Sequence, residues 1–92
     1  MKNKITSVKL NNYLNLTEKA LTKIKINKEF SKQAEDILDM AKRYFRDANY
    51  YKEKGDFVTA FAAVNYAHAW LDAGARAGIF EVNNSENLFC VD

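Results

Sequence analysis

The side chains best placed to do chemistry are His68, Asp72 and Arg76, which follow one another at intervals of four residues. On a helix this spacing puts them on one face, where Asp72 could orient the imidazole and Arg76 could pair with the carboxylate. Asn65 belongs to the same narrow sector. The strip could bind a small polar or anionic ligand, or it could be a set of ion pairs that satisfies polar groups beside the core. We favour the structural interpretation, because such networks often imitate sites.

Two aromatic residues, Tyr66 and Trp70, lie one turn apart on another face of the same segment, among alanines. A surface helix needs only one apolar stripe, so a second apolar face implies cover. That cover could come from the C-terminal tail, from the first helix or from a second subunit. The candidate binding residues are therefore Asn65, Tyr66, His68, Trp70, Asp72 and Arg76.

The sequence shows no other constellation that carries chemistry. There is one histidine, one cysteine (Cys90) far from it, and no glycine-rich phosphate loop or dinucleotide fingerprint. No base stands next to Cys90 or to a recognisable nucleophilic serine. We expect no catalytic residues, no metal, no cofactor and no enzymatic activity.

A helix over residues 57–77 must position all six candidates. Asp56 is a suitable N-cap and Gly78 a suitable residue just beyond the C-terminal end. The main apolar stripe follows a spacing of three and four residues, and it comprises Phe57, Ala60, Phe61, Val64, Ala67, Leu71 and Ala75. Ala63 and Gly74 flank the stripe and are small enough to let another helix come close.

Two amphipathic helices precede it, over residues 7–26 and 29–54. Thr6 or Ser7 could cap the first, and Asn27 or Ser31 the second. The second has a near-heptad apolar stripe, which runs through Phe30, Ala34, Ile37, Ala41, Tyr44, Ala48 and Tyr51. Short connections at 26–29 and 55–56 force successive helices to run antiparallel. The sequence predicts one all-α domain over residues 1–92, a three-helix up-and-down bundle with a short irregular C-terminal tail.

The tail contains two apolar groups. Ile79, Phe80 and Val82 are predicted to fold over the face that carries Tyr66 and Trp70. A second group is too apolar to remain solvated and must dock on its own chain or on a neighbouring one, namely Leu88, Phe89 and Val91.

The segment YYKEKGDFVTAFAAVNYAHAWLDAGARAGIF resembles a small archaeal family, the domain-of-unknown-function family numbered 357. The resemblance rests on a Gly-Asp joint followed by three short motifs, here Gly55-Asp56, Ala60-Phe61, Tyr66-Ala67-His68 and Trp70-Leu71-Asp72-Ala73-Gly74. It extends over roughly residues 10–80. It implies a left-handed three-helix up-and-down bundle in a stand-alone archaeal protein, and it implies no activity.

Composition bounds the remaining possibilities. The 48% hydrophobic and 28% charged content is typical of a soluble globular protein. No stretch approaches ~20 consecutive apolar residues, so we expect no membrane span. The N-terminal lysines precede no apolar run, which argues against a signal peptide. A single cysteine favours a reduced, cytoplasmic setting.

Charge is unevenly distributed along the chain. Residues 1–32 hold eight lysines and two glutamates, a net of +6, whereas residues 33–92 hold six basic and ten acidic side chains, a net of −4. The lysines could touch phosphates or could simply keep the first helix soluble, and no nucleic-acid recognition module is evident. We predict a non-enzymatic protein–protein interaction or self-associating module, with a homodimer as one form, and expect no nucleic acid. The alternative is a small-ligand or RNA-binding protein that uses the His68/Asp72/Arg76 strip or the lysine-rich first helix.

Overall fold

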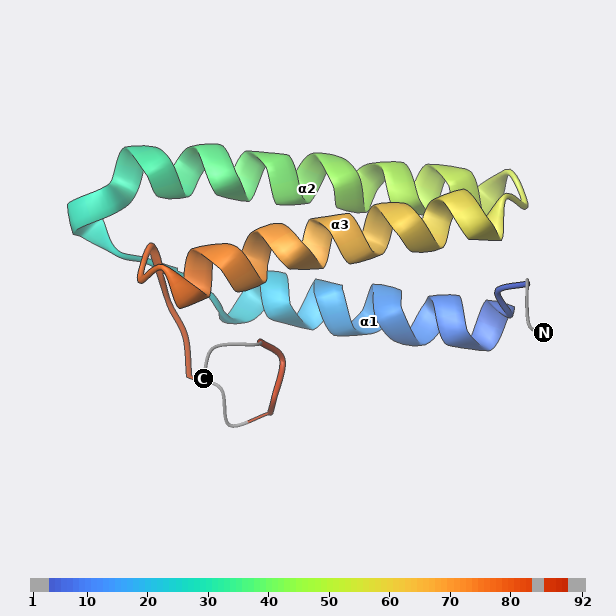
Figure 1. Ribbon diagram of the computed structural model, residues 1–92, viewed down its shortest axis with the longest axis horizontal. Coiled ribbons are helices and arrows are strands. Elements are labelled where there is room, and N and C mark those ends of the chain that lie inside the picture. The colour runs from blue at the N-terminus through green and yellow to red at the C-terminus, as the bar shows by residue number, and fades with distance from the viewer. Residues whose placement is uncertain (1–3, 84–85, 90–92) are drawn as a thin grey trace.

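A computed structural model describes residues 4–83 and 86–89 of the chain. Within these ranges three α-helices lie side by side, namely α1 (Ser7–Lys23), α2 (Ser31–Glu53) and α3 (Phe57–Arg76), as Figure 1 shows. The helix α3 packs along both others, whereas α1 and α2 make few contacts with each other. The predicted all-α three-helix bundle is confirmed, and α3 is unbroken. No helix in the described ranges is both long and apolar enough to cross a bilayer.

The helix ends show how local sequence sets the boundaries. The Asp56 carboxylate accepts a hydrogen bond from the Thr59 amide at 3.1 Å and caps α3. Hydrogen bonding to Thr59, from its side chain and then its amide, lowers the pKa of Asp56 below 3.8. At the other end Gly78 has a φ of +77°, and the Ile79 amide donates to the Gly74 carbonyl at 2.9 Å. Both predicted caps of α3 are confirmed, and Thr6 is the residue that caps α1.

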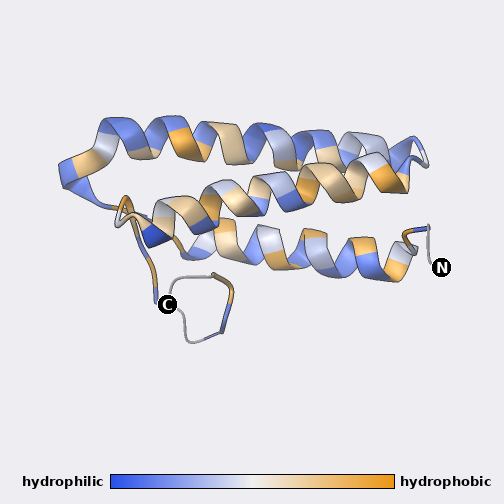
Figure 2. Ribbon diagram, viewed as in Figure 1, coloured by the Kyte–Doolittle hydropathy of each residue, from blue (hydrophilic) through white to orange (hydrophobic). Residues whose placement is uncertain are grey.

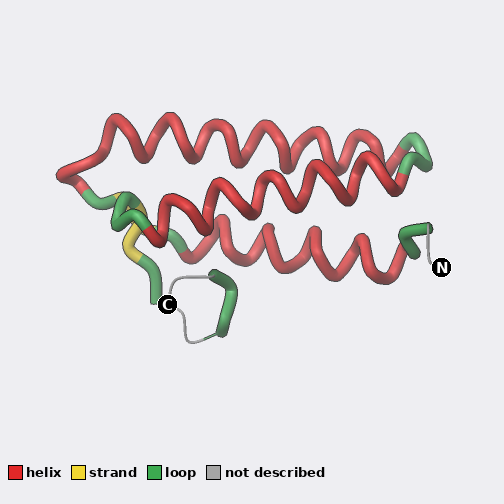
Figure 3. Tube along the Cα trace, viewed as in Figure 1, coloured by secondary structure: helices red, strands yellow, loops and turns green. Residues whose placement is uncertain are grey.

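The predicted end of the first helix, at residue 26, is wrong. The helix α1 stops at Lys23, and β1 (Lys25–Ile26) pairs antiparallel with β2 (Phe80–Glu81) at the left of Figure 3. The Asn27 amide and side chain also donate to the carbonyls of Ile79 and Gly78, both at 2.9 Å. These backbone partners lie more than fifty residues away, so the local pattern could not reveal them. The tail is therefore not wholly irregular.

The second helix also starts later than residue 29. A 3₁₀ turn, η1 (Lys28–Phe30), precedes α2, and Asn27 caps this turn rather than the α-helix. The Glu29 amide donates to the Asn27 side chain at 3.1 Å. The predicted ends at residues 54 and 77 differ from the observed ones by a single residue each, which is within the ordinary uncertainty of helix boundaries.

Two apolar clusters fill the bundle. One lies toward the N-terminal half of α3 and is built on Leu10, Leu14, Ala48, Ala60 and Val64. The other lies toward its C-terminal half and is built on Ala20, Ala34, Ala41, Leu71, Phe80, Leu88 and Phe89. The predicted stripes of the second and third helices supply Ala34, Ala41, Ala48, Ala60, Val64 and Leu71 to these clusters, although Phe30 is 37% exposed.

The close approach at Gly74 comes from the tail and not from another helix as predicted. A methyl group built on Gly74 would overlap the ring of Phe80, which is 2% exposed. Gly78 reverses the chain just beyond α3, so β2 returns along the last turn of the helix. The Phe80 ring then occupies the space that a side chain at position 74 would fill.

Candidate functional site

The six candidate residues do not form one site. His68 and Asp72 are partly buried, with side chains 14% and 27% exposed. Asn65, Tyr66 and Arg76 are exposed, and Trp70 packs against the apolar cluster that contains Leu71. The predicted polar sector is therefore divided between an interior pair and two exposed residues.

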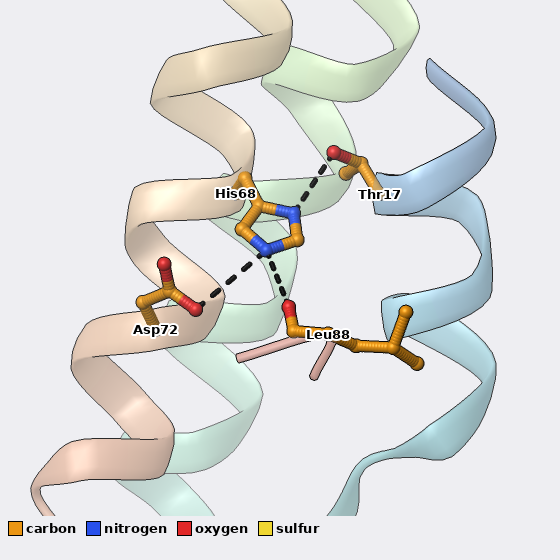
Figure 4. Close-up of polar contacts among 4 residues, drawn as sticks. All are labelled: Thr17, His68, Asp72 and Leu88. Atoms are coloured by element: carbon orange, nitrogen blue, oxygen red, sulfur yellow. Dashed lines mark hydrogen bonds and ion pairs between the residues drawn. The ribbon is translucent and has the colours of Figure 1, made fainter. Parts of the chain in front are cut away.

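His68 joins three segments of the chain (Figure 4). Its Nδ1 lies 3.0 Å from the hydroxyl of Thr17 on α1, and its Nε2 lies 2.7 Å from the carbonyl oxygen of Leu88 in the tail. The carboxylate of Asp72 is further away, 3.6 Å from Nε2. Because a carbonyl only accepts, Nε2 carries a hydrogen, and Nδ1 of the neutral ring accepts from the Thr17 hydroxyl.

The docked tail completes this environment. Leu88 and Phe89 are 4% and 6% exposed, and the Phe89 ring stacks on the imidazole with centroids 6.4 Å apart. These two residues dock on their own chain, which was one of the two predicted outcomes. Val91 and Cys90 lie outside the described residues.

Sequence reasoning missed Thr17, which is 1% exposed. A signal was present, because Leu10, Leu14 and Thr17 follow the apolar spacing of four and three residues on α1. A hydroxyl on a buried stripe needs a polar partner, and the only histidine of the chain supplies it.

Both ring nitrogens of His68 have partners within the protein, and Asp72 is also engaged. To act as a general base, the imidazole would have to release Thr17 or the tail. The contacts of His68 with Thr17 and Leu88 link α1, α3 and the tail, and we call these three residues the polar clip. Among the described residues, no group of three His, Cys, Asp or Glu side chains could hold a metal ion.

The two aromatic side chains have different neighbours. Tyr66 lies against α2, which was not among the predicted covers, whereas Trp70 packs against the apolar cluster that includes Phe80, Leu88 and Phe89. The Tyr66 ring stacks on Tyr44 of α2, with centroids 4.5 Å apart and planes 27° apart, yet Tyr66 remains 55% exposed. Trp70 is partly buried, and in the described part of the chain its indole N–H is buried without a hydrogen-bond acceptor. Phe80, expected over this face, packs against Gly74 and belongs to the apolar cluster against which Trp70, Ile79 and Val82 also pack.

A row of exposed apolar side chains runs the length of α3. We call this row the outer face of α3; it consists of Val58, Ala62, Tyr66, Ala69, Ala73 and Ala77. Val58 and Tyr66 are 59% and 55% exposed. Asn65 and Arg76 border the row on one side. On the other side a hollow of about 240 Å³ lies between the exposed edges of α3 and α2. It is lined by Tyr44, Asp47, Tyr51, Thr59, Ala62, Ala63 and Tyr66.

The remaining polar surfaces are less organised. A groove of about 710 Å³ between α1 and residues 86–88 has a mixed lining of Asn12, Asn15, Leu16, Glu18, Lys19, Glu86 and Leu88. The lysines of α1 are exposed but dispersed, and the ammonium of Lys9 lies 5.4 Å from the centre of the Phe61 ring. Neither surface gathers like charges into a patch.

One comparison with known proteins, against models of protein families, gives a match. Residues 12–80 match the model of a family described as "Protein of unknown function (DUF357)". Neither curated proteins nor solved structures give a match. Since the matched residues make up well over half of the sequence and include α2, α3 and most of α1, the chain belongs to the DUF357 family.

Proposed function

We propose that the chain is a non-enzymatic protein-binding module whose contact surface is the outer face of α3. The observation that supports this proposal is that six residues spread over the whole helix are exposed and that none of them is polar apart from the Tyr66 hydroxyl. In Figure 2 the ribbon of α3 is coloured mostly in hydrophobic shades, whereas the ribbon of α2 contains more hydrophilic blue. A soluble helix ordinarily turns charged side chains to water. A continuous apolar face is typical of a surface that another protein covers.

The tyrosine gives this surface an anchor. Tyr44 holds the ring of Tyr66 in a stacked position, so little side-chain freedom would be lost on binding. Aromatic anchors fixed before binding are common among the residues that dominate interface energies. The alanines on either side would let a partner backbone come close.

The test compares two variants that add the same charge. Ala69→Glu places a carboxylate in the middle of the outer face, and Gln33→Glu places one on the exposed side of α2. The immobilised wild-type chain should capture protein from solution, including soluble copies of itself. Immobilised Ala69→Glu should lose this capture, and immobilised Gln33→Glu should retain it. Equal capture by the three proteins would refute the proposal.

A small ligand at the His68 strip has less support, because the chain itself occupies both ring nitrogens. RNA binding by the dispersed lysines also lacks a clustered patch. Titration with single-stranded RNA at low and high salt tests that second candidate, since phosphate contacts produce salt-dependent binding. A cytoplasmic location remains a prediction from the single cysteine.

A further inference from the structure

We infer that the occupant of the outer face of α3 is a second copy of the same chain, packed through an antiparallel pairing of the two α3 helices. The inference rests on the proposed function and specifies its partner. It follows from the order of the exposed residues along the helix, from the charges at the two helix ends and from the size of the face.

The outer face has the same spacing in both directions. Its residues lie at positions 58, 62, 66, 69, 73 and 77, separated by four, four, three, four and four residues. A two-fold axis between positions 67 and 68 would therefore place Tyr66 against Ala69 of the partner subunit. In a two-fold interface residue i meets j and j meets i, so such a self-complementary row is what the symmetry requires.

The sizes of the paired side chains also agree. The same axis places Val58 against Ala77 of the partner subunit, and Ala62 against Ala73 of the partner subunit. Each contact then joins an alanine to a side chain of equal or larger size, and no two bulky groups collide. Alanine along the seam would allow helix axes to approach to about 8 Å, the short end of the usual range.

The charges favour the antiparallel orientation. Asp56 stands exposed at the N-terminal end of α3, and Arg76 is exposed at its C-terminal end. Antiparallel packing brings each Asp56 within about three residues of Arg76 of the partner subunit, roughly 4.5 Å along the helix axis. It also sets the positive end of each helix dipole beside the negative end of the other. A parallel pair would instead place like charges and like dipole ends together.

The size of the face predicts a weak dimer. A helix of 20 residues is about 30 Å long and about 10 Å wide, which gives a footprint of roughly 300 Å². A standard stable interface buries about 800 Å² on each partner. Even with the bordering rings of Tyr44 and Tyr51, the association should depend on concentration and remain reversible.

Engineered cysteines can test the pairing. In a Cys90→Ser background, the double variant Ala62→Cys/Ala73→Cys should form disulfide-linked dimers under mild oxidation at high protein concentration. The two cysteines cannot join within one chain, because they lie eleven residues or about 16 Å apart along α3. Each single variant should remain monomeric, since in the antiparallel pair position 62 is equally far from its own copy. All three substituted side chains are either exposed or in the tail, and circular dichroism verifies that the variants fold.

Cross-linking by either single variant would overturn the antiparallel arrangement, and failure of the double variant to cross-link would overturn the dimer. If the double variant fails while Ala69→Glu still abolishes capture of a different protein, the inference falls and the proposed function stands. If Ala69→Glu alters neither self-association nor capture, both fall.

Discussion

The contact between Gly74 and Phe80 can be tested with Gly74→Ala, which should destabilise the chain when the Phe80 ring is present and stabilise it when the ring is absent. Gly74→Ala has two opposing effects on the free energy of unfolding. Replacing glycine by alanine within a helix stabilises by about 1 kcal/mol. The new methyl group would overlap the Phe80 ring, and overpacking of this kind costs about 1–3 kcal/mol. We expect the overpacking cost to exceed the propensity gain, because Phe80 is held in β2 by its pairing with Ile26 and is only 2% exposed.

The net effect should be a loss of about 0–2 kcal/mol, because the helix-propensity gain offsets part of the overpacking cost. In a Phe80→Leu background the ring is absent, and Gly74→Ala should instead stabilise by about 1 kcal/mol. The coupling between the two substitutions is then about 1–3 kcal/mol, the size expected for residues in contact.

Urea unfolding followed by circular dichroism measures all four proteins of this cycle. Each kcal/mol corresponds to roughly 4–8 °C in melting temperature for a domain of this size. Ala73→Gly, on the exposed side of the same helix, calibrates the propensity contribution. If Gly74→Ala stabilises the wild-type chain as much as it stabilises Phe80→Leu, the ring does not lie on Gly74 and the docking of β2 described above is wrong.

Three further predictions concern the core, the polar clip and the helix cap. Ala67→Phe should lower the free energy of unfolding by about 1–3 kcal/mol, because Ala67 is fully buried; an unchanged urea midpoint would contradict that packing. Thr17→Val should lower the free energy of unfolding by about 1–3 kcal/mol, because it leaves Nδ1 of His68 without its partner. Thr22→Val removes an exposed hydroxyl and should cost much less. Equal losses of stability in chemical denaturation would show that the polar clip is unimportant. The pKa of Asp56 is lowered in the folded chain, so its charge stabilises the protein above about pH 4, and this contribution disappears as the pH falls through the folded pKa. Asp56→Asn keeps the cap but removes that titration. Its stability should therefore be lower than that of the wild type at neutral pH, and the difference should shrink as the pH falls through the folded pKa of Asp56. A pH-independent difference would refute the linkage.

Local sequence determined the helices and most of their ends. The spacing of Leu71, Val64 and Ala60 marks the buried side of α3 without reference to any other element, because a helix repeats every 3.6 residues. Asp56 and Gly78 mark its ends because capping involves only neighbours in the chain. The division of α3 into buried, polar and exposed apolar faces is likewise a property of one helix.

The tertiary structure decided where each face points and what the polar residues contact. His68, Asp72 and Arg76 are equivalent in spacing, yet His68 and Asp72 are partly buried while Arg76 is exposed, and Nε2 of His68 contacts the Leu88 carbonyl in the tail. Lys25 and Ile26 form a strand and not the end of a helix, because the returning β2 pairs with them. Such contacts join residues twenty or more positions apart, and Thr17 and His68 are more than fifty positions apart, so no local periodicity encodes them. Helical periodicity could show that α3 had a second apolar face, but only the packing of α2 and the tail showed that the outer face of α3 is exposed.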